Sequence, residues 1–211
     1  MGKMLNVVLR PTEELVEAAV SLSARIAQDH ETDFVLDGVT FHPHVTLYKI
    51  SIADEDVLGV YARVQQVARR HRPISCPFGA FQDGRGYLYL RLKPEEALQL
   101  LHAELVRALN GVRIRGARIR SKGREAVMSS EERFNNLRYG HPNVLDTYRP
   151  HMSISRLRDP DEVGRVLKEI SWPENWTEQV FRSSMLGVYL MGEHGTCREL
   201  VYTAPLRGEM P

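Results

Sequence analysis

The alternation of hydrophobic and polar positions divides the chain into amphipathic helices and short strands. Leu5 to Leu9 is an apolar run that ends before Pro11, which is typical of a buried strand. Apolar residues at helical spacing follow, after an N-cap residue at Thr12 and two acidic residues in the first turn. By the same criteria, helices are predicted over residues 12–28, 57–70, 94–109 and 159–170.

The other regular segments alternate between apolar and polar residues or have turn residues at their ends, as strands do. Strands are predicted over residues 5–9, 41–50, 74–81, 86–92, 148–156, 184–191 and 198–204, with a short strand or loop at 33–39. Asp83-Gly84 is a strong hairpin signal, and a second hairpin turn is predicted at residues 193–195. Residues 128–147 have weak periodicity, which favours a short helix and a long loop. Helices interspersed with hairpin-joined strands indicate an α+β fold.

One nine-residue pattern occurs twice, as FHPHVTLYK at residues 41–49 and as YRPHMSISR at residues 148–156. Both copies run aromatic, basic, Pro, His, apolar, hydroxyl, aliphatic, polar, basic. Successive side chains of a strand point to opposite faces, so His44 shares a face with Thr46, and His151 shares a face with Ser153. The Pro before each His cannot donate to a sheet ladder, which places the start of each strand at the His.

Two strands that each offer an imidazole and a hydroxyl suit the cleavage of a phosphodiester. A neutral imidazole can remove a proton from an attacking water, and a protonated one can give a proton to the departing alkoxide. The hydroxyls can donate hydrogen bonds to the non-bridging phosphate oxygens, where negative charge is concentrated. We therefore predict that His44, His151, Thr46 and Ser153 are catalytic, with either histidine able to serve as the base.

Four flanking residues are candidates for substrate binding. His42 and Arg149 precede the two histidines at equivalent places and can contact substrate or border a cleft. Arg156 offers a guanidinium that suits phosphate, and Tyr48 offers a ring that can stack on a base, although roles in the core or at the surface explain both equally well. His42 and His44 also form a His-x-His pair. Neither motif strand carries Asp or Glu, so we predict no metal site.

The tetrapeptides His44-x-Thr46-Leu47 and His151-x-Ser153-Ile154 resemble the paired motifs of the two-histidine (2H) phosphoesterase superfamily. That group includes the enzymes called 2'-5' RNA ligases or RNA cyclic phosphodiesterases. The doubling, with matching flanks, makes the resemblance specific. It implies metal-independent hydrolysis of 2',3'-cyclic or 2'-5' phosphodiesters, above all on RNA ends, with reverse ligation as an accompanying activity.

Two alternatives to that function stay open. One keeps the mechanism but acts on a small molecule such as ADP-ribose cyclic phosphate. The other is a non-catalytic protein that binds RNA ends. For the fold, no low-complexity segment separates the two copies. We therefore expect one domain, residues 1–211, made of two pseudo-symmetric lobes around a central cleft, each lobe an antiparallel sheet with flanking helices.

Composition narrows the setting of this function. The 211 residues are 43% hydrophobic and 26% charged with a formal net charge of +1, so the whole-chain charge does not single out a nucleic-acid binder. Cys76 and Cys197 lack ligand or redox spacing, and no segment resembles a signal peptide or a transmembrane helix. We expect a cytoplasmic monomer that needs no cofactor and whose partner is RNA or a nucleotide with a cyclic phosphate.

The chain has one markedly basic run, from Arg113 to Arg124. Near a phosphate site this run would attract an anionic substrate. A charged edge strand that resists aggregation explains it equally well.

Overall fold

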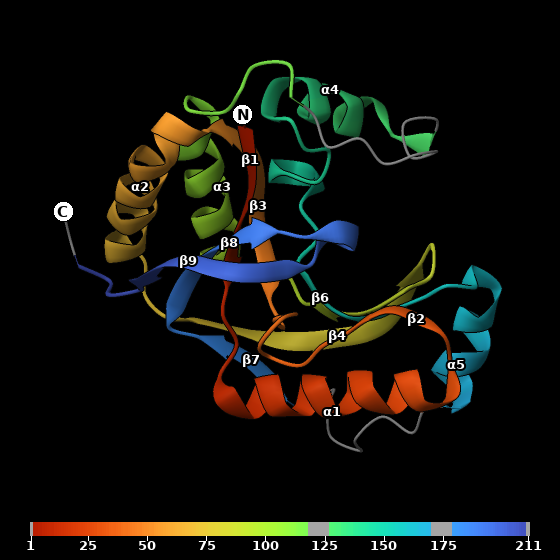
Figure 1. Cartoon of the computed structure of the whole chain (residues 1–211). Coiled ribbons are helices and arrows are strands. Elements are labelled where there is room, and N and C mark those ends of the chain that lie inside the picture. Colours follow the sequence, from red (N-terminus) through yellow and green to blue (C-terminus); the bar gives the residue numbers. More distant parts are fainter. Residues whose placement is uncertain (1, 118–126, 170–178, 210–211) are drawn as a thin grey trace.

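The computed structural model of the chain, drawn in Figure 1, describes residues 2–117, 127–169 and 179–209. Strands and helices alternate irregularly along the chain, in the order β1-α1-β2-β3-α2-β4-β5-α3-α4-β6-α5-β7-β8-β9, with short 3-10 turns between some of them. This order confirms the α+β prediction.

The predicted helices are present. Their bounds are α1 Glu13–Asp29, α2 Val57–Arg70, α3 Glu96–Asn110, α4 Ser130–Tyr139 and α5 Val163–Glu169. α4 is the short helix expected after residue 128, and a reciprocal capping box between Ser129 and Glu132 fixes its start. No helix in the described ranges is long and apolar enough to cross a membrane.

The strands form one sheet in which every pair of neighbouring strands is antiparallel, and the spatial order of the strands differs from their order in the chain. Their bounds are β1 Gly2–Leu9, β2 Thr32–Val35, β3 Val45–Ala53, β4 Ile74–Gly84, β5 Tyr87–Leu92, β6 His151–Leu157, β7 Val180–Ser183, β8 Met185–Met191 and β9 Cys197–Pro205. The spatial order is β7-β4-β5-β6-β3-β1-β8-β9, and β2 also pairs with β6. β7 was not predicted, because four residues are too few to show a period of two.

Two lobes meet in this sheet, as predicted, but they are not consecutive halves of the chain. One lobe contains β1, β3, β8 and β9, and α2 and α3 contact it. The other contains β2, β4, β5, β6 and β7, and α1 and α5 contact it. Figure 1 shows the two helix groups on opposite sides of the molecule. The β4–β5 hairpin therefore lies beside β6, the strand of the second motif. The C-terminal β8–β9 hairpin lies in the lobe that contains β3, the strand of the first motif.

The lobes are joined where the two motif strands meet. β3 and β6 are antiparallel neighbours through a single pair of residues, Val45 opposite Met152, and both side chains are fully buried. Each of these residues directly follows a motif histidine. β6 begins at His151, as predicted, whereas β3 begins at Val45, one residue after His44.

The β4–β5 turn lies two residues later than predicted. Gly84 pairs with Tyr87, so Arg85 and Gly86 form the two-residue connection. Both have positive φ, 53° and 87°, as a type I′ turn requires. A Cβ on Gly86 would also lie 2.7 Å from the carbonyl oxygen of Leu157, which is why glycine suits this position.

A β-bulge interrupts the ladder between β1 and β3. Val8 lies opposite Thr46, and its neighbour Val7 lies opposite Tyr48. Leu47, between Thr46 and Tyr48, has no partner on β1 and is therefore an extra residue on β3. Leu47 and Tyr48 are consequently buried in succession. Beyond the bulge, the residues on the motif's polar face are the odd-numbered ones, beginning with Lys49.

Candidate active site

The four predicted catalytic residues lie around the single pair that joins the lobes. His44 and Thr46 stand on either side of Val45 in the chain, and His151 and Ser153 stand on either side of Met152, so all four flank the junction of the lobes. The central pair points into the core, so its four neighbours point to the other face of the sheet. All four are half-buried. Each strand thus contributes one imidazole and one hydroxyl to a shared surface with approximate twofold symmetry.

Both imidazoles are held in the same way by the backbone. Nδ1 of His44 lies 2.7 Å from the carbonyl oxygen of His42, and Nδ1 of His151 lies 2.8 Å from that of Arg149. A carbonyl oxygen can only accept a hydrogen bond, so each Nδ1 carries a proton. When the ring is neutral, the lone pair is therefore on Nε2, which can then accept a proton.

The surroundings of His44 favour its neutral form. Burial lowers its pKa to about 4, although the hydrogen bond to the His42 carbonyl opposes this, and the positive charges of Lys49 and His151 lower it further. His44 is therefore neutral at pH 7, which is the state that a base needs.

The two hydroxyls have different neighbours. Oγ1 of Thr46 accepts a hydrogen bond from Nδ2 of Asn6, at 3.1 Å, so the hydroxyl proton is the group that Thr46 can donate to a ligand. Asn6 is fully buried in β1 and was not predicted from the sequence. Ser153 pairs with Tyr89 of β5, whose ring lies 4.9 Å from the ring of His151.

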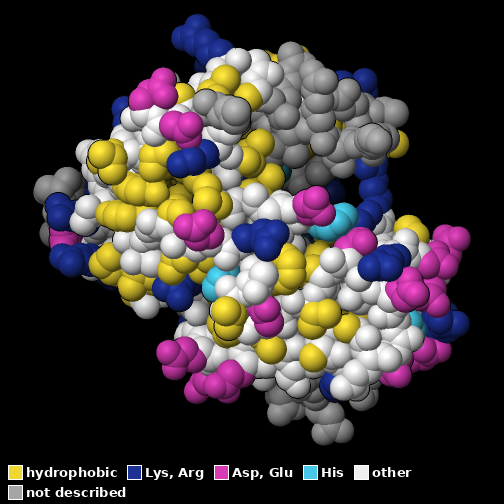
Figure 2. All heavy atoms as spheres, in the orientation of Figure 1, with side chains coloured by type: hydrophobic (Ala, Val, Ile, Leu, Met, Phe, Trp, Pro, Cys, Tyr) yellow, Lys and Arg dark blue, Asp and Glu magenta, His cyan; other side chains and the backbone are white. Residues whose placement is uncertain are grey.

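A small hollow connects the two lobes at this surface. It is lined by Phe34 and Leu36 after α1, by His42, His44 and Ser153 of the motifs, and by His194, Gly195 and Thr196 of the β8–β9 connection. Figure 2 shows histidine, acidic and basic side chains together on the face where the lobes meet. Both lobes therefore contribute to a hollow beside His44 and Ser153.

The two residues that precede the motif histidines have different environments. The ring of His42 lies 5.0 Å from that of Tyr189, and its pKa is lowered by burial and by the charge of Arg10. His42 is also one of the residues that line the hollow. Arg149 is exposed, and its carbonyl oxygen accepts hydrogen bonds from His151 and, at 3.2 Å, from Arg91. Its predicted contact with substrate stays a prediction.

Tyr48 does not lie at this surface, which corrects the prediction that its ring stacks on a base. Its side chain is 1% exposed, and its hydroxyl donates to the carbonyl oxygen of Tyr139 at 2.6 Å. The physical reason is the bulge at Leu47, which turns Tyr48 into the core. Lys49 takes the place that strict alternation would have given to Tyr48.

Arg156 ties the lobes together. Its guanidinium forms an ion pair with Asp33 of β2, donates to Nδ1 of His194 at 2.9 Å, and lies 5.2 Å from the centre of the Tyr87 ring. The Tyr87 hydroxyl donates to the carbonyl oxygen of His194. These contacts hold the β8–β9 connection against the opposite lobe. Asp33 offsets the charge of Arg156, and a direct role in binding phosphate stays a prediction.

A buried histidine that was not predicted supports the first motif. Nδ1 of His102, on α3, lies 2.7 Å from the Leu47 carbonyl oxygen, and Nε2 accepts from the backbone N–H of Leu145 at 2.8 Å. Its ring stacks on Tyr148 with 3.7 Å between centroids, and the Tyr148 hydroxyl donates to the Thr46 carbonyl oxygen. Both carbonyls belong to the bulged segment of β3, so these contacts fix the backbone that carries Thr46.

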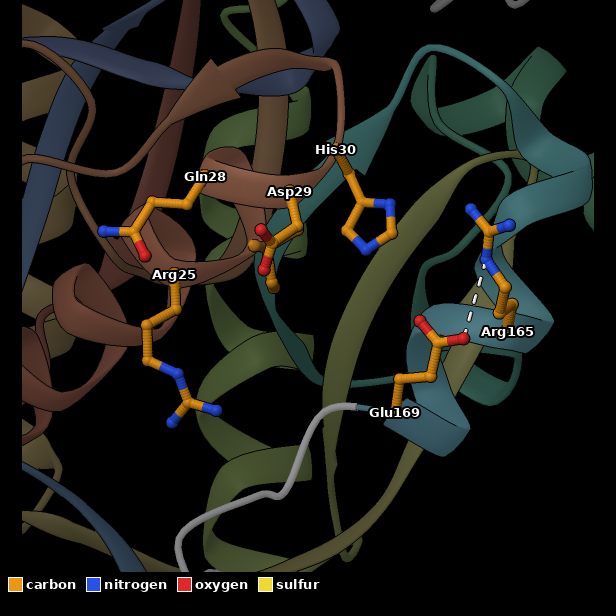
Figure 3. A pocket seen from close by; sticks show the side chains of 7 residues that line it. Arg25, Gln28, Asp29, His30, Arg165 and Glu169 are labelled. Carbon is orange, nitrogen blue, oxygen red and sulfur yellow. Dashed lines mark ion pairs between the residues drawn. The ribbon is translucent and has the colours of Figure 1, made fainter.

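A second hollow, of about 480 Å³, lies between the C-terminal end of α1 and α5. Figure 3 shows its polar lining, which includes Arg25, Asp29 and His30 from α1 and the residue after it, and the ion pair of Arg165 with Glu169 from α5. His30 faces Glu162 at 3.6 Å. Among the described residues that line this hollow, none brings a second imidazole or a hydroxyl to His30, and we assign the hollow no catalytic role.

Two other predictions concern charge and metals. Of the basic run, Arg118 to Arg124 lies outside the described residues. Arg113 donates to the carbonyl oxygens of Ala117 and Arg138, so it stabilises the end of α4. Within the described ranges, no three His, Cys, Asp or Glu side chains gather closely enough to hold a metal ion.

Known proteins resemble this chain in sequence and in fold. The family model described as the 2'-5' RNA ligase superfamily matches residues 40–189, and a search of curated proteins finds no match. Among solved structures, TT0787 of Thermus thermophilus aligns with a TM-score of 0.60 and 15% identity, over 98% of this chain and all of that one. E. coli LigT complexed with 3'-AMP aligns with a TM-score of 0.58 and 11% identity, over 97% of this chain and 98% of that one.

At these identities the two solved structures show a common fold. The family match is stronger, because it covers more than half of the chain and includes both motif histidines and both motif hydroxyls. The chain belongs to the 2'-5' RNA ligase superfamily of two-histidine phosphoesterases.

Proposed function

We propose that the protein is a metal-independent phosphodiesterase that opens the 2',3'-cyclic phosphate of RNA ends or nucleotides to a 2'-monophosphate. One observation carries the proposal. The two motifs meet at the Val45–Met152 pair, so that one imidazole and one hydroxyl from each motif flank the same junction, and both rings have Nδ1 bound to a backbone carbonyl.

In the proposed reaction His44 is the base and His151 is the acid. His44 is neutral at pH 7, so its Nε2 takes a proton from a water whose oxygen attacks phosphorus. A new P–O bond forms, and the bond from phosphorus to O3' breaks. His151 gives a proton to that departing oxygen. Thr46 and Ser153 donate hydrogen bonds to the non-bridging oxygens, whose charge grows in the transition state.

The choice of substrate class has separate support. The family is described as 2'-5' RNA ligases, and structures of LigT have been solved with phosphate and with 3'-AMP. The two histidines also suit a small cyclic phosphate such as that of ADP-ribose, and the same surface could bind an RNA end without reaction.

A panel of substrates separates these functions. The purified protein is assayed with 2',3'-cyclic mononucleotides, RNA that ends in a cyclic phosphate, and ADP-ribose cyclic phosphate. We expect the highest kcat/KM for the RNA and a 2'-phosphate as product. A preference for the ADP-ribose compound would favour the small-molecule enzyme. Tight binding of the RNA without turnover of any compound would favour the non-catalytic protein.

The lowered pKa of His44 predicts the acidic side of the pH profile. The base must be unprotonated in the free enzyme, so kcat/KM should fall only as the pH drops through the pKa of His44, at about 4. The acidic limb should therefore lie well below 6.5, the pKa of an unperturbed histidine. NMR titration of the ring, assigned with a His44→Asn variant, measures the same pKa. An acidic limb at pH 6.5 or higher would rule out His44 as the base.

Removal of metal tests the mechanism independently. The two imidazoles and two hydroxyls supply the base, the acid and the hydrogen-bond donors, so dialysis against EDTA should leave kcat unchanged. A metal hydroxide held by His42 and His44 would behave differently. Activity that is lost with EDTA and restored by a divalent ion would replace the two-histidine mechanism.

A further inference from the structure

Lys49 reaches the active-site surface because of the bulge in β3. Without the extra residue, strict alternation would put Tyr48 beside Thr46 and would turn Lys49 away. The register instead shifts between Thr46 and Tyr48, and the burial pattern after the bulge places Tyr48 in the core and leaves Lys49 half-buried on the other face. The bulge therefore places Lys49 on the same face of the strand as Thr46.

One contact and two charge interactions locate the ammonium group. Nζ of Lys49 lies 2.9 Å from the position that a Cβ on Gly195 would occupy, and Gly195 lines the same hollow as His44 and Ser153. The charge of Lys49 also acts on His44 and on Cys197. Gly195 has a φ of 77° and no side chain, so the β8–β9 connection can lie against the ammonium.

The chemistry of the reaction calls for a cation here. A cyclic phosphodiester carries one negative charge, and attack by water brings more charge onto the non-bridging oxygens. The two hydroxyls are neutral donors, and Asp33 offsets the charge of Arg156. An ammonium has three donors and a compact charge, which suits a phosphate oxygen.

We propose that Lys49 binds a non-bridging oxygen of the substrate phosphate, on the His44 side of the site. This inference rests on the proposed function. The inference also gives the bulge at Leu47 a functional role, because the bulge both buries Tyr48 and turns Lys49 toward the phosphate. When the phosphate is bound, its negative charge balances that of Lys49, which lets His44 take a proton more readily than in the unliganded protein.

The test compares Lys49→Gln with Lys49→Arg and with Lys168→Gln, a matched loss of charge on the exposed face of α5. For a 2',3'-cyclic mononucleotide, Lys49→Gln should lower kcat/KM on the order of 10²-fold, the usual cost of losing one donor to developing charge. Lys49→Arg should recover part of this loss, and Lys168→Gln should equal the parent. Circular dichroism and thermal unfolding establish that each variant is folded.

Two readouts do not depend on turnover. The affinity for a 2'-monophosphate is measured by NMR titration, from the change in the ring signals of His44. It should weaken by about 10-fold in Lys49→Gln. The pKa of His44 in the unliganded variant should rise, because a nearby positive charge has been removed. The pKa change reports only that Lys49 lies near His44, and the affinity separates the roles: a purely structural Lys49 would leave the affinity for the monophosphate unchanged in a variant that folds normally.

The outcomes separate this inference from the proposed function. If the parent hydrolyses cyclic phosphates and Lys49→Gln matches it in kcat/KM and in affinity for the monophosphate, the role of Lys49 is overturned and the phosphodiesterase stands. If the parent hydrolyses none of the compounds but Lys49→Gln still loses affinity for the monophosphate, Lys49 binds phosphate in a protein with another function.

Discussion

Replacing His44 or His151 with alanine is expected to lower kcat on a 2',3'-cyclic phosphate by about 10²- to 10⁴-fold, the usual contribution of a general acid or base. The double variant should be only slightly slower than either single variant. The reason is that the two imidazoles act on one phosphate in one step, so the loss of either proton transfer removes most of the benefit of the other.

Shape-preserving variants separate catalysis from structure. An asparagine at position 44 or 151 keeps a side-chain N–H near the place of Nδ1, which can still donate to the backbone carbonyl, but it cannot transfer a proton. These variants should unfold at nearly the parent's temperature and be as inactive as the alanine variants. His30→Ala, in the second hollow, serves as the control and should keep full activity. Near-parental turnover in either single variant would remove that histidine from the mechanism.

The second large effect is expected on stability, at His102. His102→Phe keeps an aromatic ring against Tyr148 but leaves the Leu47 carbonyl and the Leu145 N–H without their partner. Two buried groups that lose a hydrogen bond cost about 2 to 4 kcal/mol together. Urea unfolding measures this cost. Tyr148→Phe removes one hydrogen bond in the same cluster and should cost about half as much.

The pH dependence of stability gives a sharper signature of His102. Burial lowers its pKa to about 4, although the hydrogen bond to the Leu47 carbonyl opposes this. As the pH falls below 6.5, the unfolded chain binds a proton at this residue and the folded chain does not, so stability falls until the pH reaches about 4. His102→Phe should lose this part of the decline, about 3 kcal/mol by the linkage relation. An unchanged pH dependence would show that His102 is not held neutral.

The candidate site could be proposed from the sequence because its signal is local. His44 and His151 stand in two copies of one pattern, and the period of two along a strand assigns each its hydroxyl. The pairing of Val45 with Met152, which brings the copies together, required the structure. The doubled pattern predicted two lobes around one cleft, but it did not predict which residues pair.

The errors of prediction have physical causes that a single strand pattern does not record. A bulge depends on how β1 pairs with β3, so the exchange of Tyr48 for Lys49 at the site surface could not be read from the β3 sequence. His102 and Asn6 act from other elements, α3 and β1, on the backbone and the hydroxyl of the motif. The β4–β5 hairpin follows the first motif in the chain but pairs with the second motif strand, and the β8–β9 hairpin follows the second motif but pairs with β1. Strand pairing over long distances in the sequence, rather than chain order, decides which lobe each hairpin joins.

The central claim is that paired imidazoles cleave a phosphodiester, and phosphorus NMR of the reaction with a 2',3'-cyclic mononucleotide tests it most directly. The cyclic phosphate signal should disappear in the presence of the parent protein, and the signal of a 2'-monophosphate should take its place without that of the 3'-isomer. With the His44→Asn, His151→Asn double variant the cyclic phosphate should persist over the same time. Equal conversion by the parent and the double variant, or conversion by neither, would contradict the account.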